Sequence, residues 1–100
     1  MNSSPDAKIS KLVEESNRIG TEFLLTDLNT GLIFLQVAQV TSVPAGRARN
    51  FEKALEVYRT VTRLLPRVVP SPDQQSKIHA MLGDLKGQLE KAGYFCEPPA

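Results

Sequence analysis

The stretch that decides the fold reads Asn50-Phe51-Glu52-Lys53-Ala54-Leu55-Glu56-Val57-Tyr58-Arg59-Thr60-Val61-Thr62-Arg63-Leu64-Leu65-Pro66. Its apolar residues recur three or four positions apart, as they do along one side of an α-helix: Phe51, Ala54, Leu55, Tyr58, Val61 and Leu65. Pro66 closes the pattern, because proline has no amide proton and disfavours helical geometry in the residue before it. The stretch therefore predicts an amphipathic helix over about residues 46–65.

A longer apolar pattern precedes this helix. Ser4-Pro5-Asp6 is a typical helix opening, and apolar residues then keep helical spacing almost to Ser42. Either one helix runs over about residues 6–42, or Gly20 and Thr21 divide it in two. A glycine costs a helix interior only about 1 kcal/mol relative to alanine, so we favour one helix with Gly20 as its weak point. The segment 41–46, which contains a proline and a glycine, is predicted to be a turn.

The sequence after Pro66 predicts a short connector and a third helix over about residues 72–92. Ser71 caps it, Pro72 occupies its first position, and Gln74 can close a capping box. Gly93 supplies the left-handed residue that ends it. Short connections favour antiparallel neighbours, so the predicted fold is all-α: an up-down-up three-helix bundle.

This bundle is expected to form a single domain over residues 1–100, with residues 1–5 and 94–100 as tails. The first helix is the longest and the most apolar around its circumference. We expect it either to lie deepest in the bundle or to carry an additional surface for a partner.

The central stretch resembles two known helical families. Phe51, Ala54, Tyr58, Val61 and Pro66 match the second helix of a tetratricopeptide repeat, and the same run is similar to the middle helix of the microtubule-interacting-and-transport domain. The match is clear over residues 50–66 and looser to residue 92. The preceding segment, which Pro44 interrupts, lacks the aromatic residue and the glycine of the repeat's first helix, and only one repeat is visible. The resemblance implies tetratricopeptide-like hairpin packing and peptide binding, with the matched residues in packing positions.

Composition narrows the functional classes. The net charge is +1, and the chain contains one cysteine, Cys96, which excludes an internal disulfide bond and a multi-cysteine zinc site. The most apolar window, 23–40, contains Asp27, Asn29, Gln36 and Gln39, which argues against a membrane span. We expect a cytoplasmic protein with no cofactor and no metal.

The sequence offers little for catalysis. His79 is the only histidine, and it lies beside an apolar stripe rather than in a polar cluster. No glycine-rich phosphate loop follows a strand. We therefore expect a protein that is not an enzyme, and a small enzyme ranks last among the alternatives.

Asp27 allows two interpretations, because it shares a helix side with Phe23 and Phe34. A buried Asp27 would need a partner such as Arg49 or Arg59, since an unpaired buried carboxylate is costly. The favoured interpretation is an acid that faces solvent.

Charge is concentrated in the middle of the chain. Residues 1–42 carry a net charge of −2, residues 43–67 carry +4, and residues 68–100 carry −1. The candidate partner-binding residues are Arg49, Arg59, Arg63 and Arg67. A stripe of arginines could bind an acidic peptide or a phosphate backbone. More commonly such arginines form a solvated helix face that pairs with neighbouring acids.

The leading functional hypothesis is a non-enzymatic protein–protein interaction module that binds a protein or peptide, including a second copy of itself through the first helix. The alternative is a binder of nucleic acid or an acidic partner. Tyr94-Phe95-Cys96 is expected to fold back over the end of the bundle, and the alternative is an exposed anchor.

Overall fold

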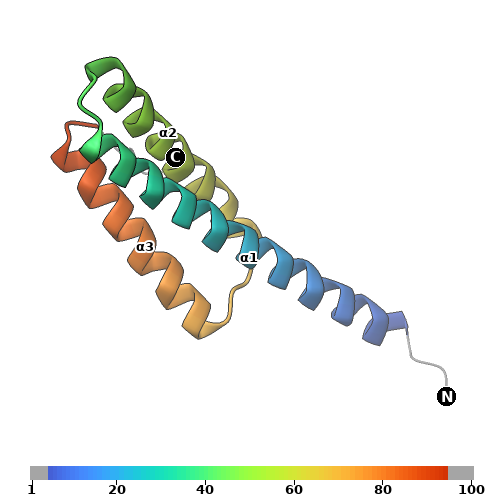
Figure 1. Ribbon diagram of the computed structural model, residues 1–100. Helices are drawn as coiled ribbons and strands as arrows, with labels where there is room; N and C mark the ends of the chain where they lie inside the picture. The colour runs from blue at the N-terminus through green and yellow to red at the C-terminus, as the bar shows by residue number, and fades with distance from the viewer. Residues whose placement is uncertain (1–4, 95–100) are drawn as a thin grey trace.

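Three helices make up most of the computed structural model, which describes residues 5–94 (Figure 1). Helix α1 spans Pro5–Val40, α2 spans Pro44–Leu64 and α3 spans Pro72–Lys91, and a 3-10 turn, η1, covers Leu65–Arg67. The helices run up, down and up, and no strand occurs among the described residues. The predicted all-α three-helix bundle is confirmed.

The helix boundaries differ slightly from the prediction. Helix α2 begins at Pro44, two residues earlier than expected, because proline fits the first helical position, where its missing amide proton is not needed. The turn between α1 and α2 is correspondingly shorter. At the other end, Pro66 lies inside η1, so the chain tightens into a 3-10 turn after Leu64 before it becomes extended.

Both ends of α3 have the predicted caps. The Ser71 hydroxyl accepts a hydrogen bond from the Gln74 backbone amide, and the Gln74 side chain accepts one from the Ser71 amide at 3.1 Å. Gly93 has a φ of +92°. The Tyr94 amide then donates to the Leu89 carbonyl at 2.9 Å, which completes a Schellman motif.

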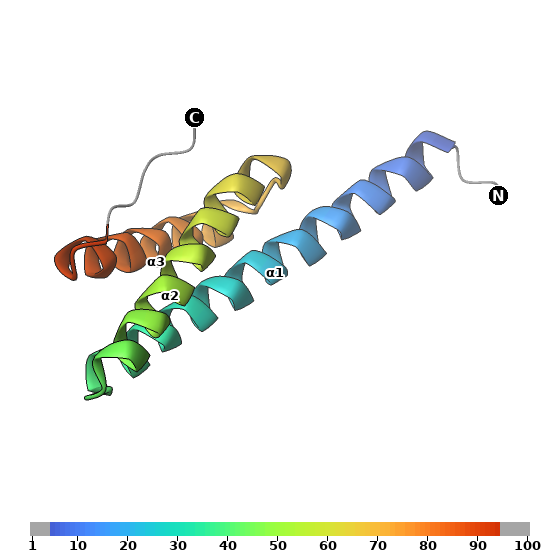
Figure 2. The ribbon, with the colours of Figure 1, turned by 90° about the horizontal axis from the view of Figure 1, so that it is seen from above.

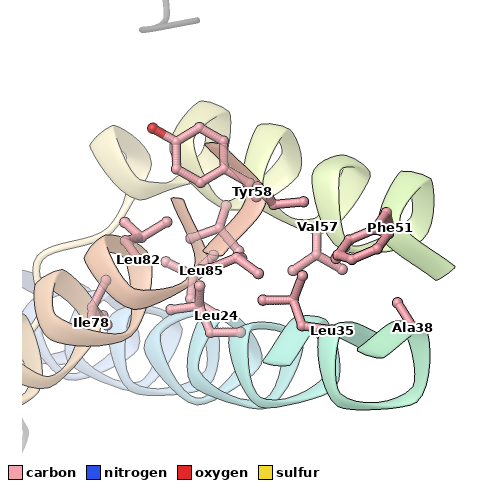
Figure 3. Packing of buried hydrophobic residues seen from close by; sticks show 13 residues of the cluster. Leu24, Leu35, Ala38, Phe51, Val57, Tyr58, Ile78, Leu82 and Leu85 are labelled. Atoms are coloured by element: carbon pink, nitrogen blue, oxygen red, sulfur yellow. The ribbon is translucent and has the colours of Figure 1, made fainter. Parts of the chain in front are cut away.

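The hydrophobic core lies where the three helices meet (Figure 3). Its buried residues come from all three: Leu24, Leu28, Leu35 and Ala38 from α1; Phe51, Ala54, Val57, Tyr58 and Val61 from α2; Ile78, Leu82, Leu85 and Leu89 from α3. The residues that carry the family resemblance in α2 are therefore packing residues. Among residues 6–94, the buried apolar residues of this cluster begin at Leu24, so residues 6–20 of α1 contribute none of them.

The N-terminal half of α1 projects beyond the bundle (Figure 2). The described chain measures 64 × 23 × 21 Å because this arm extends past the ends of α2 and α3. We call residues 6–19 of α1 the arm. Gly20 does not break the helix, so the prediction of one continuous helix is confirmed.

The connector after η1 packs on α1 where the arm leaves the bundle. A Cβ atom on Gly20 would lie 2.6 Å from Cγ1 of Val68, so only glycine allows this approach without a shift. The Val69 amide donates to the Asn17 side-chain oxygen at 3.1 Å. Gly20 thus marks the point where the bundle ends and the arm begins.

Candidate functional site: the outer face of helix α1

A regular stripe of residues follows the solvent-facing side of α1 along nearly its whole length. We call it the outer seam, and its members alternate at spacings of three and four: Ile9, Leu12, Ser16, Ile19, Phe23, Thr26, Thr30, Ile33, Val37 and Val40. This is the heptad spacing of a coiled-coil seam, with Ile9 at the first a position and Leu12 at the first d position. Thr30 is half-buried, and the other nine residues are exposed.

The seam is mostly apolar although it faces water. Its apolar residues have these exposed fractions: Ile9 58%, Leu12 65%, Ile19 59%, Phe23 53%, Ile33 48%, Val37 40% and Val40 83%. Val13, which lies beside the seam, is 53% exposed. Single exposed apolar residues are common on proteins, but a contiguous stripe of this length is typical of an interaction surface.

A second stripe on α1 explains why the outer seam stays free. Core-facing residues alternate at the same spacing: Thr21, Leu24, Leu28, Gly31, Leu35 and Ala38. At 3.6 residues per turn the two stripes lie roughly 150° apart around the helix. Helices α2 and α3 cover the inner stripe, so neither can cover the outer seam.

The spacing of apolar residues in the sequence predicts an apolar first helix but does not by itself separate these two stripes. In the sequence, one apolar series at helical spacing includes Ile9, Leu12, Ile19 and Phe23 together with Leu24, Leu28 and Leu35. The available signal was the pair of interleaved heptads. Of the two expectations for this helix, a deep position holds only for the inner side of residues 21–40, and an additional surface for a partner stays a prediction for the exposed arm.

The four candidate arginines do not form a single site. Arg59 and Arg63 line a shallow hollow of about 620 Å³ on the outward side of α2, together with Glu52, Glu56 and Tyr94. Arg49 lies on α2 ten residues before Arg59, about 15 Å away along the helix axis.

All four arginines, including Arg67 on η1, are exposed. Two carboxylates share the hollow with two guanidinium groups, so its charge is balanced rather than strongly positive.

Asp27 does not form the buried ion pair that was considered. Its side chain is half-buried in a shallow hollow near Phe23, Phe34 and Lys53. Arg49 and Arg59 are exposed, and no ion pair to Asp27 lies within 4 Å among residues 6–94. The Lys53 ammonium instead lies 5.5 Å from the centre of the Phe34 ring.

The remaining candidates also lie on the surface or against the core. His79 is exposed on α3. The half-buried Tyr94 ring stacks on Phe51 with the ring centres 5.3 Å apart, as expected for a tail that folds back. Phe95 and Cys96 lie outside the described residues. Within residues 6–94, no group of three or more histidine, cysteine or acidic side chains could hold a metal ion.

Helix α1 is also long and apolar enough to cross a membrane, judged by length and composition alone. An 18-residue window within Asp6–Val40 has a mean hydropathy of 1.3, and 28% of that window is buried inside the fold. The core helix of a bundle and an N-terminal signal sequence have the same properties, so they do not by themselves indicate a membrane span.

Comparison with known proteins assigns no family: no protein-family description, no curated protein and no solved structure matches the chain.

Proposed function

We propose that this protein is a non-enzymatic protein–protein interaction module whose contact surface is the outer seam of α1. The observation that carries the proposal is the exposed heptad stripe, which extends over 32 residues from Ile9 to Val40. The bundle serves as a rigid support, because the inner stripe of the same helix is locked into the core. Such a surface suits an amphipathic helix, which would bury its own apolar stripe against the seam.

The exposed arm supports the same proposal. Isolated helices shorter than about 12–15 residues are marginally stable in water. The arm has almost that length, and nearly all its side chains are exposed. A partner helix along the seam would bury Ile9, Leu12 and Ile19 and so stabilise the arm.

A membrane surface is a less suitable partner for the arm. Helices that lie on membranes carry a polar face rich in lysine and arginine. The arm carries Lys8, Lys11 and Arg18, which Asp6, Glu14 and Glu15 balance. Its polar side therefore has no net attraction to anionic lipids.

The proposal can be tested by native size fractionation of extracts from the source cells, with the tagged chain at its natural level. Wild-type protein should elute well above its 11.0 kDa monomer mass, and the double variant Leu12→Glu/Ile19→Glu should elute as a monomer. Arg59→Ala/Arg63→Ala is the matched control on α2 and should elute like the wild type. A wild-type chain that elutes as a monomer, or a seam variant that stays in the larger assembly, would refute the proposal.

A further inference from the structure

We infer that the partner of the outer seam is a second copy of this chain, which binds as an antiparallel helix in one register. In that register, residue i of one copy faces residue 49 − i of the other. The inference rests on the proposed function, since it names the partner of the same seam. Three properties of the seam carry it: its length, its pattern of polar residues and its flanking charges.

The register uses the whole seam. When two heptad helices pack antiparallel, each a position of one helix faces a d position of the other. Here every seam residue from Ile9 to Val40 has such a partner. The facing residues are Ile9 and Val40, Leu12 and Val37, Ser16 and Ile33, Ile19 and Thr30, and Phe23 and Thr26. Each arm then lies along residues 30–43 of the other copy, so both arms gain a neighbour at once.

The polar residues of the seam fit this register. Ser16, Thr26 and Thr30 each face a bulky apolar residue of the other copy, namely Ile33, Phe23 and Ile19 in that order. The Thr30 hydroxyl already donates to the Thr26 carbonyl at 3.0 Å, so burying it leaves no unpaired donor. Each layer thus combines one large and one small or medium residue, which favours close packing.

Other arrangements of two seams either place polar residues against each other or leave apolar residues without a partner. A parallel dimer would stack Ser16 on Ser16, Thr26 on Thr26 and Thr30 on Thr30. Sliding the antiparallel pair by one heptad would leave either Val37 and Val40, or Ile9 and Leu12, without a partner.

The charges beside the seam favour the same orientation. In a parallel dimer, Glu22 at a g position would lie near Asp27 of the other copy at an e position, and these two acids repel each other. In the antiparallel register, Glu22 lies near Asn29 of the other copy, and Glu15 lies near Gln36. On the other flank, the apolar Val13 lies near Phe34, which extends the contact.

The exposed area is sufficient for a dimer. The apolar seam residues are each 40% to 83% exposed. Together they expose on the order of 800 Å² per copy, which is about what each partner buries in an interface of standard size. The contact would be about 48 Å long, since 32 residues rise about 1.5 Å each.

Cysteine cross-linking tests the register directly. In a Cys96→Ser background, two proteins are prepared that carry either Ser16→Cys or Ile33→Cys, with a size tag on one of them. Their mixture should form mainly the mixed disulfide under mild oxidation, because these residues face each other. Ser16→Cys alone should form at least 10-fold less dimer, because its two copies would be about 25 Å apart. Glu90→Cys, at an exposed position of α3, is the control, because its yield of disulfide-linked dimer measures cross-linking by random collision.

Sedimentation of the purified chain provides the second measurement. Leu12→Glu should raise the dimer dissociation constant at least 100-fold, whereas Ser10→Glu, on the opposite side of the same arm, should change it less than 3-fold. Both sites lie in the arm, outside the core, so neither substitution can unfold the bundle.

The outcomes separate this inference from the proposed function. A dimer that cross-links through Ser16→Cys alone would overturn the antiparallel register and leave the seam as the contact surface. A purified monomer whose cell extract contains a seam-dependent assembly would overturn self-association and leave the proposed function intact. Flotation of the monomer with vesicles of phosphatidylcholine and phosphatidylserine, in place of any such assembly, would overturn both.

Discussion

The two halves of α1 share the heptad spacing of the outer seam but differ in composition and in surroundings, since residues 6–20 carry six charged side chains and residues 21–40 carry two. In residues 21–40 the helix has two apolar stripes, and α2 and α3 cover one of them. In residues 6–20 the large apolar side chains are more than half exposed, and the connector after η1 contacts this half at Asn17 and Gly20. The difference teaches that heptad spacing alone does not show whether a helix face is buried, because the outer seam is mostly exposed in both halves and only the inner stripe, which α2 and α3 cover, is buried.

The largest difference in stability should appear when one leucine is truncated in each half of α1. Leu28 is fully buried, and Leu28→Ala should lower the free energy of unfolding by about 2–5 kcal/mol, because it loses transfer energy and leaves a cavity. Leu12→Ala should lower it by less than about 0.5 kcal/mol in dilute monomer. Urea unfolding at low protein concentration measures both values, and equal losses would contradict the distinction between the halves.

The next largest effect concerns close packing at a glycine in the buried half. A Cβ atom on Gly31 would lie 2.8 Å from Cγ1 of Val57 and 3.3 Å from Cδ2 of Leu85. Gly31→Ala should therefore destabilise the fold by about 1–2 kcal/mol, since overpacking costs more than the gain in helix propensity.

Gly87 on α3 is the matched control, because a Cβ atom there would meet nothing within 4 Å. Gly87→Ala should stabilise the fold by about 0.5–1 kcal/mol through helix propensity alone. A Gly31→Ala protein that gains the same stability would show that this half of α1 is loosely packed.

A smaller effect is expected at the boundary between the halves. Thr21 is 1% exposed, and its hydroxyl has no hydrogen-bond partner among the described residues. Thr21→Val keeps the shape and removes the unpaired hydroxyl, so it should raise the free energy of unfolding by about 1 kcal/mol. A Thr21→Val protein that is less stable than the wild type in thermal unfolding would mean that the Thr21 hydroxyl forms a hydrogen bond in solution.

The smallest effect should come from the arginines on α2. Arg59 and Arg63 are exposed, and no ion pair within 4 Å involves them among residues 6–94. Arg59→Ala/Arg63→Ala should change stability by less than about 0.5 kcal/mol per residue. It should leave self-association unchanged as well. A large loss of either would move the interaction surface from α1 to α2.

Much of the fold could be predicted from the sequence because its signals are local. The Ser71 and Gln74 capping box, the Gly93 stop and the spacing around Tyr58 each depend on a few neighbouring residues. The sequence places Pro44 in the predicted turn, because a proline in a loop and a proline at the first helical position look alike in sequence.

The candidate site was harder to predict, because it depends on what covers each face of one helix. Leu12 and Leu24 carry the same side chain, and both lie in apolar heptads of α1. Leu24 lies on the inner stripe, which α2 and α3 cover, whereas Leu12 lies on the outer seam and beyond the point near Gly20 where Val68 packs on the helix. The arginines are candidates because the middle of the sequence has a net positive charge. In the structure, Glu52 and Glu56 line the same hollow as Arg59 and Arg63 and balance their charge.

Amide hydrogen exchange as a function of protein concentration tests the central claim, that the outer seam is an interface between two copies. At low concentration the amides of residues 8–19 should exchange much faster than those of residues 24–38, because no core protects the arm. As the concentration rises through the dimer dissociation constant, the protection of residues 8–19 should increase strongly in the wild type and remain low in Leu12→Glu. Exchange in the arm that is the same at every concentration would contradict the account.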